Sequence, residues 1–122
     1  MSTCKNRLEK LENGEFNVVL AQFYSDVPKA ISRVRKVIEG FQHHFGERDA
    51  TLFSVPGRTE LGGNHTDHQH GKVLCAAVEE DMLCCASPNG RNLIRIIPEG
   101  MEAVELDLSC LLPAEEEKYT SI

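Results

Sequence analysis

A polar, glycine-rich segment at residues 56–71 concentrates the side chains that could do chemistry. It reads Pro-Gly-Arg-Thr-Glu-Leu-Gly-Gly-Asn-His-Thr-Asp-His-Gln-His-Gly, far more polar groups than a plain turn needs. Its glycines at 57, 62 and 63 allow backbone N–H groups to approach a ligand closely. Hydrogen-bond donors and acceptors come from Arg58, Asn64, His65 and Asp67. Because vicinal hydroxyls each donate and accept, the segment predicts a site for a polyhydroxylated ligand such as a sugar.

Other chemistries remain open for the same segment. Four potential zinc ligands cluster there: His65, Asp67, His68 and His70. Structural zinc usually draws ligands from two separated knuckles, and no closely spaced cysteine pair completes a set. We therefore expect no metal site, with a small metal-binding module kept as an alternative. The glycine pair at 62 and 63 lacks the Gly-Lys-Ser/Thr ending of a phosphate loop, so it is only a weak signal for phosphate binding. We expect His43, His44 and His70 to be solvated surface residues.

The segment resembles the signature of the galactokinases, one branch of the galactokinase, homoserine kinase, mevalonate kinase and phosphomevalonate kinase (GHMP) superfamily. The usual signature is Pro-Gly-Arg-Val-Asn-Leu-Ile-Gly-Glu-His-Thr-Asp-Tyr, followed by Gly and an apolar strand. The residues in register with it are Pro56, Gly57, Arg58, Leu61, Gly63, His65, Thr66 and Asp67. The positions that differ are Glu60, Gly62, Asn64 and His68, where Asn, Ile, Glu and Tyr are usual.

The resemblance implies a role for each matched side chain. The galactose hydroxyls would be bound by Asn64, His65, Thr66 and Asp67. Arg58 would lie beside the attacking C1 hydroxyl and stabilise the transition state, because a fixed guanidinium offsets the charge that spreads over a transferred phosphoryl group. Asn64 keeps an acceptor without a negative charge, so we expect its hydrogen bond to be weaker than that of the usual carboxylate.

By the same resemblance, the complete enzyme transfers the γ-phosphoryl group of ATP to α-D-galactose with Mg²⁺. The family's ATP-phosphate block, Gly-Leu-Ser-Ser-Ser-Ala at a helix N-terminus, has no counterpart in these 122 residues. We therefore expect an inactive N-terminal fragment that binds neither ATP nor Mg²⁺ tightly and lacks the C-terminal part of the same enzyme. A non-catalytic, galactose-binding regulatory relative is the other open interpretation.

The elements around the segment change from helical to strand periodicity. Three helices are predicted, at 4–12, at 15–23, and from a cap at Ser25 or Asp26 to Gly46. Five strand-like runs follow, at 51–55, 72–78, 82–86, 93–97 and 104–108, with turn residues at 56–57, 88–90 and 98–100. This order predicts an α+β fold with the long helix on a mixed, largely antiparallel sheet. The resemblance implies the N-terminal lobe of the GHMP kinase fold, which is ribosomal protein S5 domain 2-like.

We expect residues 1–24 to form a helical extension and residues 25–122 an incomplete galactose-binding domain. The net charge of -6 opposes nucleic-acid binding, which rests on neutralising phosphates. No apolar run approaches the roughly 20 residues that cross a bilayer, and the five cysteines lack metal-type spacing. We therefore expect a cytoplasmic protein with reduced thiols and neither nucleic-acid nor membrane partners.

Overall fold

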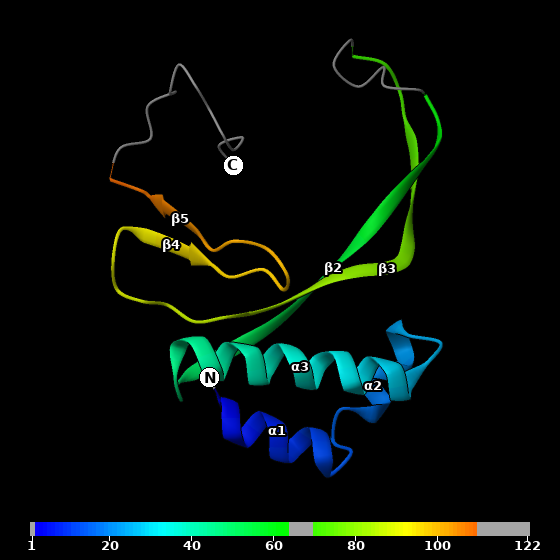
Figure 1. Cartoon of the computed structure of the whole chain (residues 1–122). Coiled ribbons are helices and arrows are strands. Elements are labelled where there is room, and N and C mark those ends of the chain that lie inside the picture. The colour runs from blue at the N-terminus through cyan, green and yellow to red at the C-terminus, as the bar shows by residue number, and fades with distance from the viewer. Residues whose placement is uncertain (1, 64–69, 110–122) are drawn as a thin grey trace. The chain divides into compact units, whose positions relative to one another are not determined.

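The computed structural model describes residues 2–63 and 70–109, in which a two-residue strand and three helices precede four longer strands (Figure 1). The chain divides into two compact units, residues 1–87 and 88–122. The first unit contains β1 (Ser2–Thr3), α1 (Cys4–Glu12), α2 (Asn17–Phe23), α3 (Val27–Phe45), β2 (Asp49–Gly62) and β3 (Leu74–Ala86). The second contains β4 (Leu93–Ile96) and β5 (Val104–Asp107). All strand pairs are antiparallel in the described ranges, which confirms the α+β prediction, while the expected domain boundary at residue 24 stays a prediction.

The long helix α3 begins and ends where its sequence signals indicate. Asp26 is the N-cap, and its side chain accepts a hydrogen bond from the Lys29 N–H at 3.0 Å. Pro28 lies in the first turn, where its missing N–H has no intrahelical partner to lose. Gly46 ends the helix with a φ of 75°, a conformation that favours glycine. The predicted cap and stop of this helix are confirmed.

The two shorter helices also form. Thr3 caps α1 by accepting from the Asn6 N–H at 3.3 Å, and the predicted end of this helix at residue 12 is confirmed. The second predicted helix begins at Asn17 rather than at Glu15, because the chain is still in a turn whose Asn17 N–H donates to the Gly14 carbonyl at 3.0 Å.

The hydrophobic core of the first unit lies between α1, α3 and the start of β2. Its buried members are Cys4, Leu11, Val34, Ile38, Phe41 and Ala50. Three side chains of strands β2 and β3 pack on this cluster: Leu52, Leu83 and Cys85. The apolar stripe of α3 therefore faces the start of β2 and the end of β3 and holds these strands against the helices.

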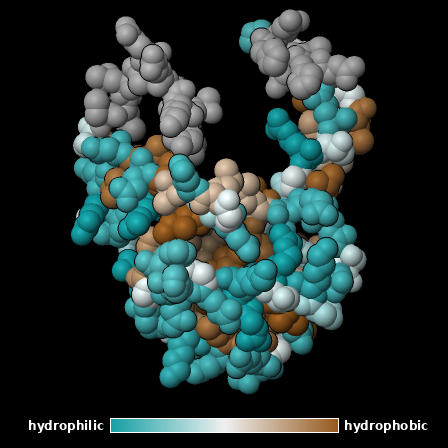
Figure 2. Space-filling model, viewed as in Figure 1, coloured by the Kyte–Doolittle hydropathy of each residue, from teal (hydrophilic) through white to brown (hydrophobic). Residues whose placement is uncertain are grey.

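Strands β2 and β3 form one long antiparallel ribbon, paired from Thr51 and Ala86 at its base to Gly62 and Leu74 at its end. The ribbon continues past the helices (Figure 1). The part of the ribbon beyond the helices carries both hydrophobic and hydrophilic side chains on the viewed face (Figure 2). Most of this distal part is exposed to solvent.

The ribbon corrects two sequence predictions. The runs predicted as separate strands at 72–78 and 82–86 are one strand, since the charged residues between them do not interrupt β3. The strand predicted at 51–55 extends to Gly62, so the first seven residues of the polar segment belong to β2 rather than to a loop. Pairing with β3 supplies the backbone hydrogen bonds that this polar sequence needs.

The second unit is a small hairpin. Its pairs run from Leu93 with Asp107 to Ile96 with Val104, which confirms the last two predicted strands. An exposed ion pair joins Arg95 Nε to Glu105 Oε1 at 3.2 Å across the hairpin.

No helix in the described ranges is long and apolar enough to cross a membrane.

Candidate functional site

Arg58 lies on β2 opposite Ala77 of β3, and Arg58 is exposed to solvent. The four residues expected to bind the sugar, Asn64, His65, Thr66 and Asp67, lie outside the described residues. The structure does fix the two strand ends that carry them, because Gly62 pairs with Leu74. Arg58 is thus held by a strand that leads directly to the predicted sugar-binding residues.

Gly63, directly after β2, lies close to the backbone of Lys72 and Val73. Its φ is 110°, and a Cβ atom there would lie 2.7 Å from the Lys72 carbonyl oxygen and 2.8 Å from Val73 Cα. No side chain fits at that separation, and the positive φ also favours glycine. The glycine that the signature shares at this position therefore has a structural cause.

Gly57 has a different reason to be glycine. Pro56 pairs with Asp81 while Arg58 pairs with Ala77, so three residues of β3 oppose Gly57 alone. At this irregularity a Cβ atom on Gly57 would lie 3.0 Å from Val78 Cγ2 and 3.1 Å from the Glu80 carbonyl oxygen. The ribbon bends where such an insertion occurs, directly before Arg58.

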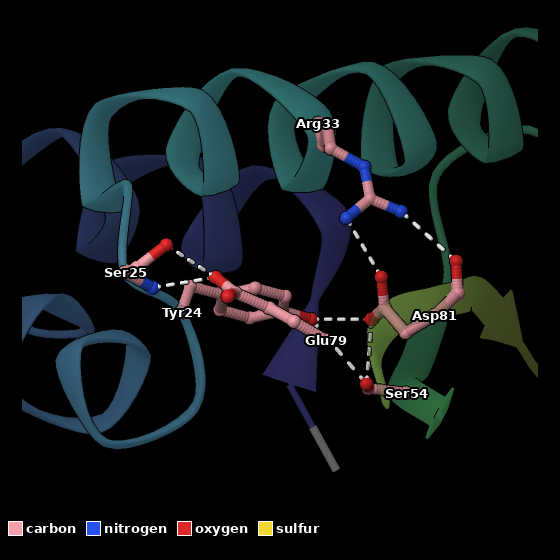
Figure 3. A network of polar contacts seen from close by, with 6 residues as sticks. All are labelled: Tyr24, Ser25, Arg33, Ser54, Glu79 and Asp81. Atoms are coloured by element: carbon pink, nitrogen blue, oxygen red, sulfur yellow. Dashed lines mark hydrogen bonds and ion pairs between the residues drawn. The ribbon is translucent and has the colours of Figure 1, made fainter. Parts of the chain in front are cut away.

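A network of polar side chains joins the helices to the ribbon beside this bend (Figure 3). We call Tyr24, Arg33, Ser54 and Asp81 the polar latch. The Arg33 Nη1 atom lies 2.7 Å from Asp81 Oδ1, and Arg33 Nη2 donates to the Asp81 carbonyl at 3.1 Å. The hydroxyl groups of Ser54, at 2.6 Å, and of Tyr24 donate to Asp81 Oδ2. The latch therefore connects α3, the end of α2 and both ribbon strands.

The latch holds Asp81 as a buried carboxylate whose side chain is only 3% exposed. Burial disfavours its charged form, but hydrogen bonds from Ser54, Tyr24 and Arg33, with the Arg33 charge, outweigh burial and lower the pKa of Asp81. Burial and the hydrogen bond to Asp81 raise the pKa of Tyr24. Asp81 is therefore ionised and Tyr24 neutral at neutral pH, the states in which Tyr24 donates to the carboxylate.

A second contact lies next to the latch. The Ser25 hydroxyl and N–H both donate to Glu79 Oε1, at 2.5 and 2.7 Å, and these bonds lower the pKa of Glu79. A shallow depression of about 220 Å³ lies here, lined by residues 24–26, Lys29, Arg33 and residues 79–80. Its lining mixes both charges, so it does not select for an anion or a cation.

The latch was missed at the level of sequence. Arg33 contacts the ribbon and Arg35 pairs with Glu12 at 2.8 Å, so both of these basic residues of the long helix have acidic partners. The available signal was the charged run at residues 79–81 inside an apolar strand, because a buried charge requires a partner.

The structure describes only some of the histidines and some of the residues that a metal site would need. His43, His44 and His70 are exposed, as expected. Within the ranges 2–63 and 70–109, no group of three His, Cys, Asp or Glu side chains is placed to hold a metal ion. His65, Asp67 and His68, which the metal alternative needs, lie outside those ranges.

Comparison with known proteins agrees with the position of this site. Residues 39–88 match the galactokinase galactose-binding signature, from the second half of α3 to the residues directly after β3. The chain is 36% identical over 75 residues to a galactokinase of Candida maltosa, a match that covers 61% of this chain and 35% of that protein. It is 31% identical over 81 residues to the galactokinase of Canis lupus familiaris, covering 66% and 21% respectively.

A bacterial relative is similar to the same degree. The galactokinase of Streptococcus mutans is 34% identical over 87 residues, which cover 68% of this chain and 22% of that protein. The chain thus spans between 21% and 35% of the length of these three relatives. No solved structure matches the chain significantly.

Proposed function

We propose that this chain, a relative of the galactokinases that carries their galactose-binding signature, is the N-terminal, galactose-binding part of such an enzyme. The match of residues 39–88 to the signature carries the proposal. The long helix, both ribbon strands and Arg58 all fall within or overlap the matched range.

The sugar would be bound by the segment that joins the ribbon strands. In this proposal the side chains of Asn64, His65, Thr66 and Asp67 bind galactose hydroxyls. The close approach of Gly63 to Lys72 and Val73 supports it, because that contact brings both ends of the segment together.

Arg58 would serve the chemical step of the complete enzyme. There, the γ-phosphoryl group of ATP moves to the C1 hydroxyl of galactose with Mg²⁺ present, and the guanidinium offsets developing negative charge. Exposure of Arg58 on β2 leaves it available to a second substrate. ATP and Mg²⁺ would be held by the rest of the enzyme, since the matched relatives are three to five times longer than their matched segments.

The chain alone is then a cytoplasmic galactose-binding part without turnover. Half of a two-substrate cleft buries little of either ligand, so its affinity for galactose is low and its affinity for ATP lower still. Assembly with the C-terminal part of the enzyme would complete the site.

The decisive experiment titrates the ¹⁵N-labelled chain with D-galactose and follows backbone amide shifts. We expect saturable shifts at residues 57–71, which are smaller with D-glucose, the C4 epimer, and absent in an Asp67→Asn variant. Asp49→Asn, an exposed carboxylate at the base of β2, is the matched control and retains the shifts. Equal responses to both sugars, or none to galactose, would contradict the proposal.

A second assay separates the two galactose-binding interpretations. The chain is mixed with ATP, Mg²⁺ and galactose, and ADP release is measured. We expect none. Galactose-dependent ADP release would overturn the claim that the chain is inactive alone, whereas tight galactose binding without it would favour the non-catalytic relative.

A further inference from the structure

The distal part of the ribbon has little burial to hold it in place. Residues 57–61 of β2 and residues 74–75 of β3 are all exposed. A two-stranded ribbon without a packed face is only marginally stable in water. Arg58 lies in this part, so its position depends on how the ribbon is anchored closer to the helices.

The polar latch lies directly before the irregular step of the ribbon that precedes Arg58. Asp81 is the pairing partner of Pro56, and Ser54 lies two residues earlier on β2. Arg58 follows Pro56 by two residues, about 7 Å along an extended strand. The latch and the predicted catalytic residue are therefore separated by a single irregular step of the ribbon.

Three features make the latch a rigid anchor rather than a surface ion pair. The side chain of Asp81 is only 3% exposed, so solvent screens its interaction with Arg33 less than it screens an exposed ion pair. Arg33 contacts both the carboxylate and the main-chain carbonyl of Asp81, which fixes the strand itself as well as its side chain. Ser54 donates to the same carboxylate from β2, so the two strands are held in one register.

We propose that the polar latch positions Arg58, and that Arg33 and Asp81 are positioning residues of this site. The proposal rests on the proposed function for what is positioned, while the latch itself lies outside the polar signature segment. Tyr24 adds the end of α2 to the anchor. Because catalysis and binding both depend on placing groups within a fraction of an ångström, loss of the anchor weakens the site without contact to substrate.

The test compares two arginines of the same helix. Arg33→Gln removes the pair with Asp81, and Arg35→Gln removes the pair with Glu12, which does not involve the ribbon. Both variants lose one arginine–carboxylate pair from α3 and the same charge. Steady-state {¹H}-¹⁵N NOE values are measured for the folded chain at residues 57–62 and 74–78, with Leu52 and Cys85 as packed references.

We expect Arg33→Gln to lower the NOE values of the distal ribbon while the packed references stay unchanged. Its dissociation constant for D-galactose should rise at least fivefold. Arg35→Gln should leave both measurements at parent values. Arg33→Lys keeps the charge but not both contacts, so it should recover part of the loss. Tyr24→Phe supplies a second variant that removes one hydroxyl without changing charge.

Each other result decides against the proposal or against one part of it. Unchanged distal NOE values in Arg33→Gln and Tyr24→Phe would overturn the latch as an anchor. Lower NOE values with unchanged galactose affinity would show that the anchor does not position the site. If the parent chain binds no galactose, the proposed function fails, but the NOE comparison still decides whether the latch anchors the ribbon.

Discussion

Arg33 on α3 contacts Asp81 on β3 at two points, the carboxylate at 2.7 Å and the main-chain carbonyl at 3.1 Å. One guanidinium thus holds a side chain and the strand from which it projects. The Asp81 side chain is only 3% exposed whereas that of Arg33 is 35% exposed, so removing Arg33 leaves a mostly buried charge without this partner, which is destabilising. The contact joins α3 to the middle of β3, where the sequence predicted two separate strands.

The first prediction concerns the dependence of stability on pH. The pKa of Asp81 in the folded chain lies below its ordinary value of 3.8, so its stabilising contribution is complete above that value. It is lost as pH falls through the lower, folded-state pKa. We expect the urea midpoint of unfolding to fall as pH decreases from 5 to 3. Asp81→Asn should have a lower midpoint at pH 7 and a weaker decrease between pH 5 and 3.

Three other carboxylates change with acid in the same direction, and one of them is Asp107, whose pKa is lowered by hydrogen bonds from Ser109. The pKa values of Glu79 and Glu47 are lowered by hydrogen bonds from Ser25 and Lys5, so Asp81→Asn should reduce the acid dependence without abolishing it. An acid dependence identical to that of the parent would show that Asp81 does not hold a lowered pKa.

The second prediction concerns the core. Ile38 is fully buried between the helices and the base of the ribbon, so Ile38→Ala removes packed methyl groups and leaves a cavity. The free energy of unfolding should fall by about 2–5 kcal/mol. Val18→Ala, at a side chain that is 73% exposed, should change it by less than about 0.5 kcal/mol. Equal effects in urea titrations would place the core elsewhere.

The third prediction concerns cysteine reactivity. Cys75 and Cys84 are exposed, whereas Cys4 is buried and burial raises the pKa of Cys85 to about 11. A thiolate is the reactive form, so a maleimide at pH 7.5 should label Cys75 and Cys84 first and Cys4 and Cys85 only when the chain opens. Mass mapping of the labelled peptides, with chain unfolded in urea as the control, checks the order. Early labelling of Cys4 would contradict the packing of α1.

The sequence predicted helices and strands correctly where neighbouring residues alone determine the structure. Asp26 and Gly46 bound α3 because capping and positive φ are properties of single residues. The prediction of two separate strands on either side of the charged run at residues 79–81 was wrong, because β3 continues through this run. Its outcome was set by distant partners, since Ser25 binds Glu79 and Arg33 binds Asp81. Pairing across more than 40 residues leaves no periodic trace in a single sequence.

One part of the candidate site was predicted from the sequence and another part was not. Arg58 was identified from the residue pattern and its resemblance to the galactokinases, and the structure places it on a paired strand. The latch had no such pattern, because an arginine on a helix face is compatible with both solvent and a buried partner. The roles of Asn64, His65, Thr66 and Asp67 stay predictions.

The last prediction separates two adjacent glycines at the end of β2. A Cβ atom on Gly63 would lie 2.7 Å from the Lys72 carbonyl oxygen at a φ of 110°, whereas nothing lies within 4 Å of a Cβ atom on Gly62. Gly63→Ala should therefore force the strand ends apart, while Gly62→Ala is tolerated, in agreement with the isoleucine usual at that place in the signature. Galactose titration and amide shifts of residues 70–75 measure both effects.

We expect Gly63→Ala to shift those amides and to weaken galactose binding at least fivefold. Gly62→Ala should retain the parent affinity. Both variants should keep the parent urea midpoint, because the hydrophobic core lies at the opposite end of the ribbon. If Gly62→Ala weakened binding as much as Gly63→Ala, the close approach at Gly63 would not be what shapes the sugar-binding segment, and the Gly62 backbone would have to contact the ligand itself.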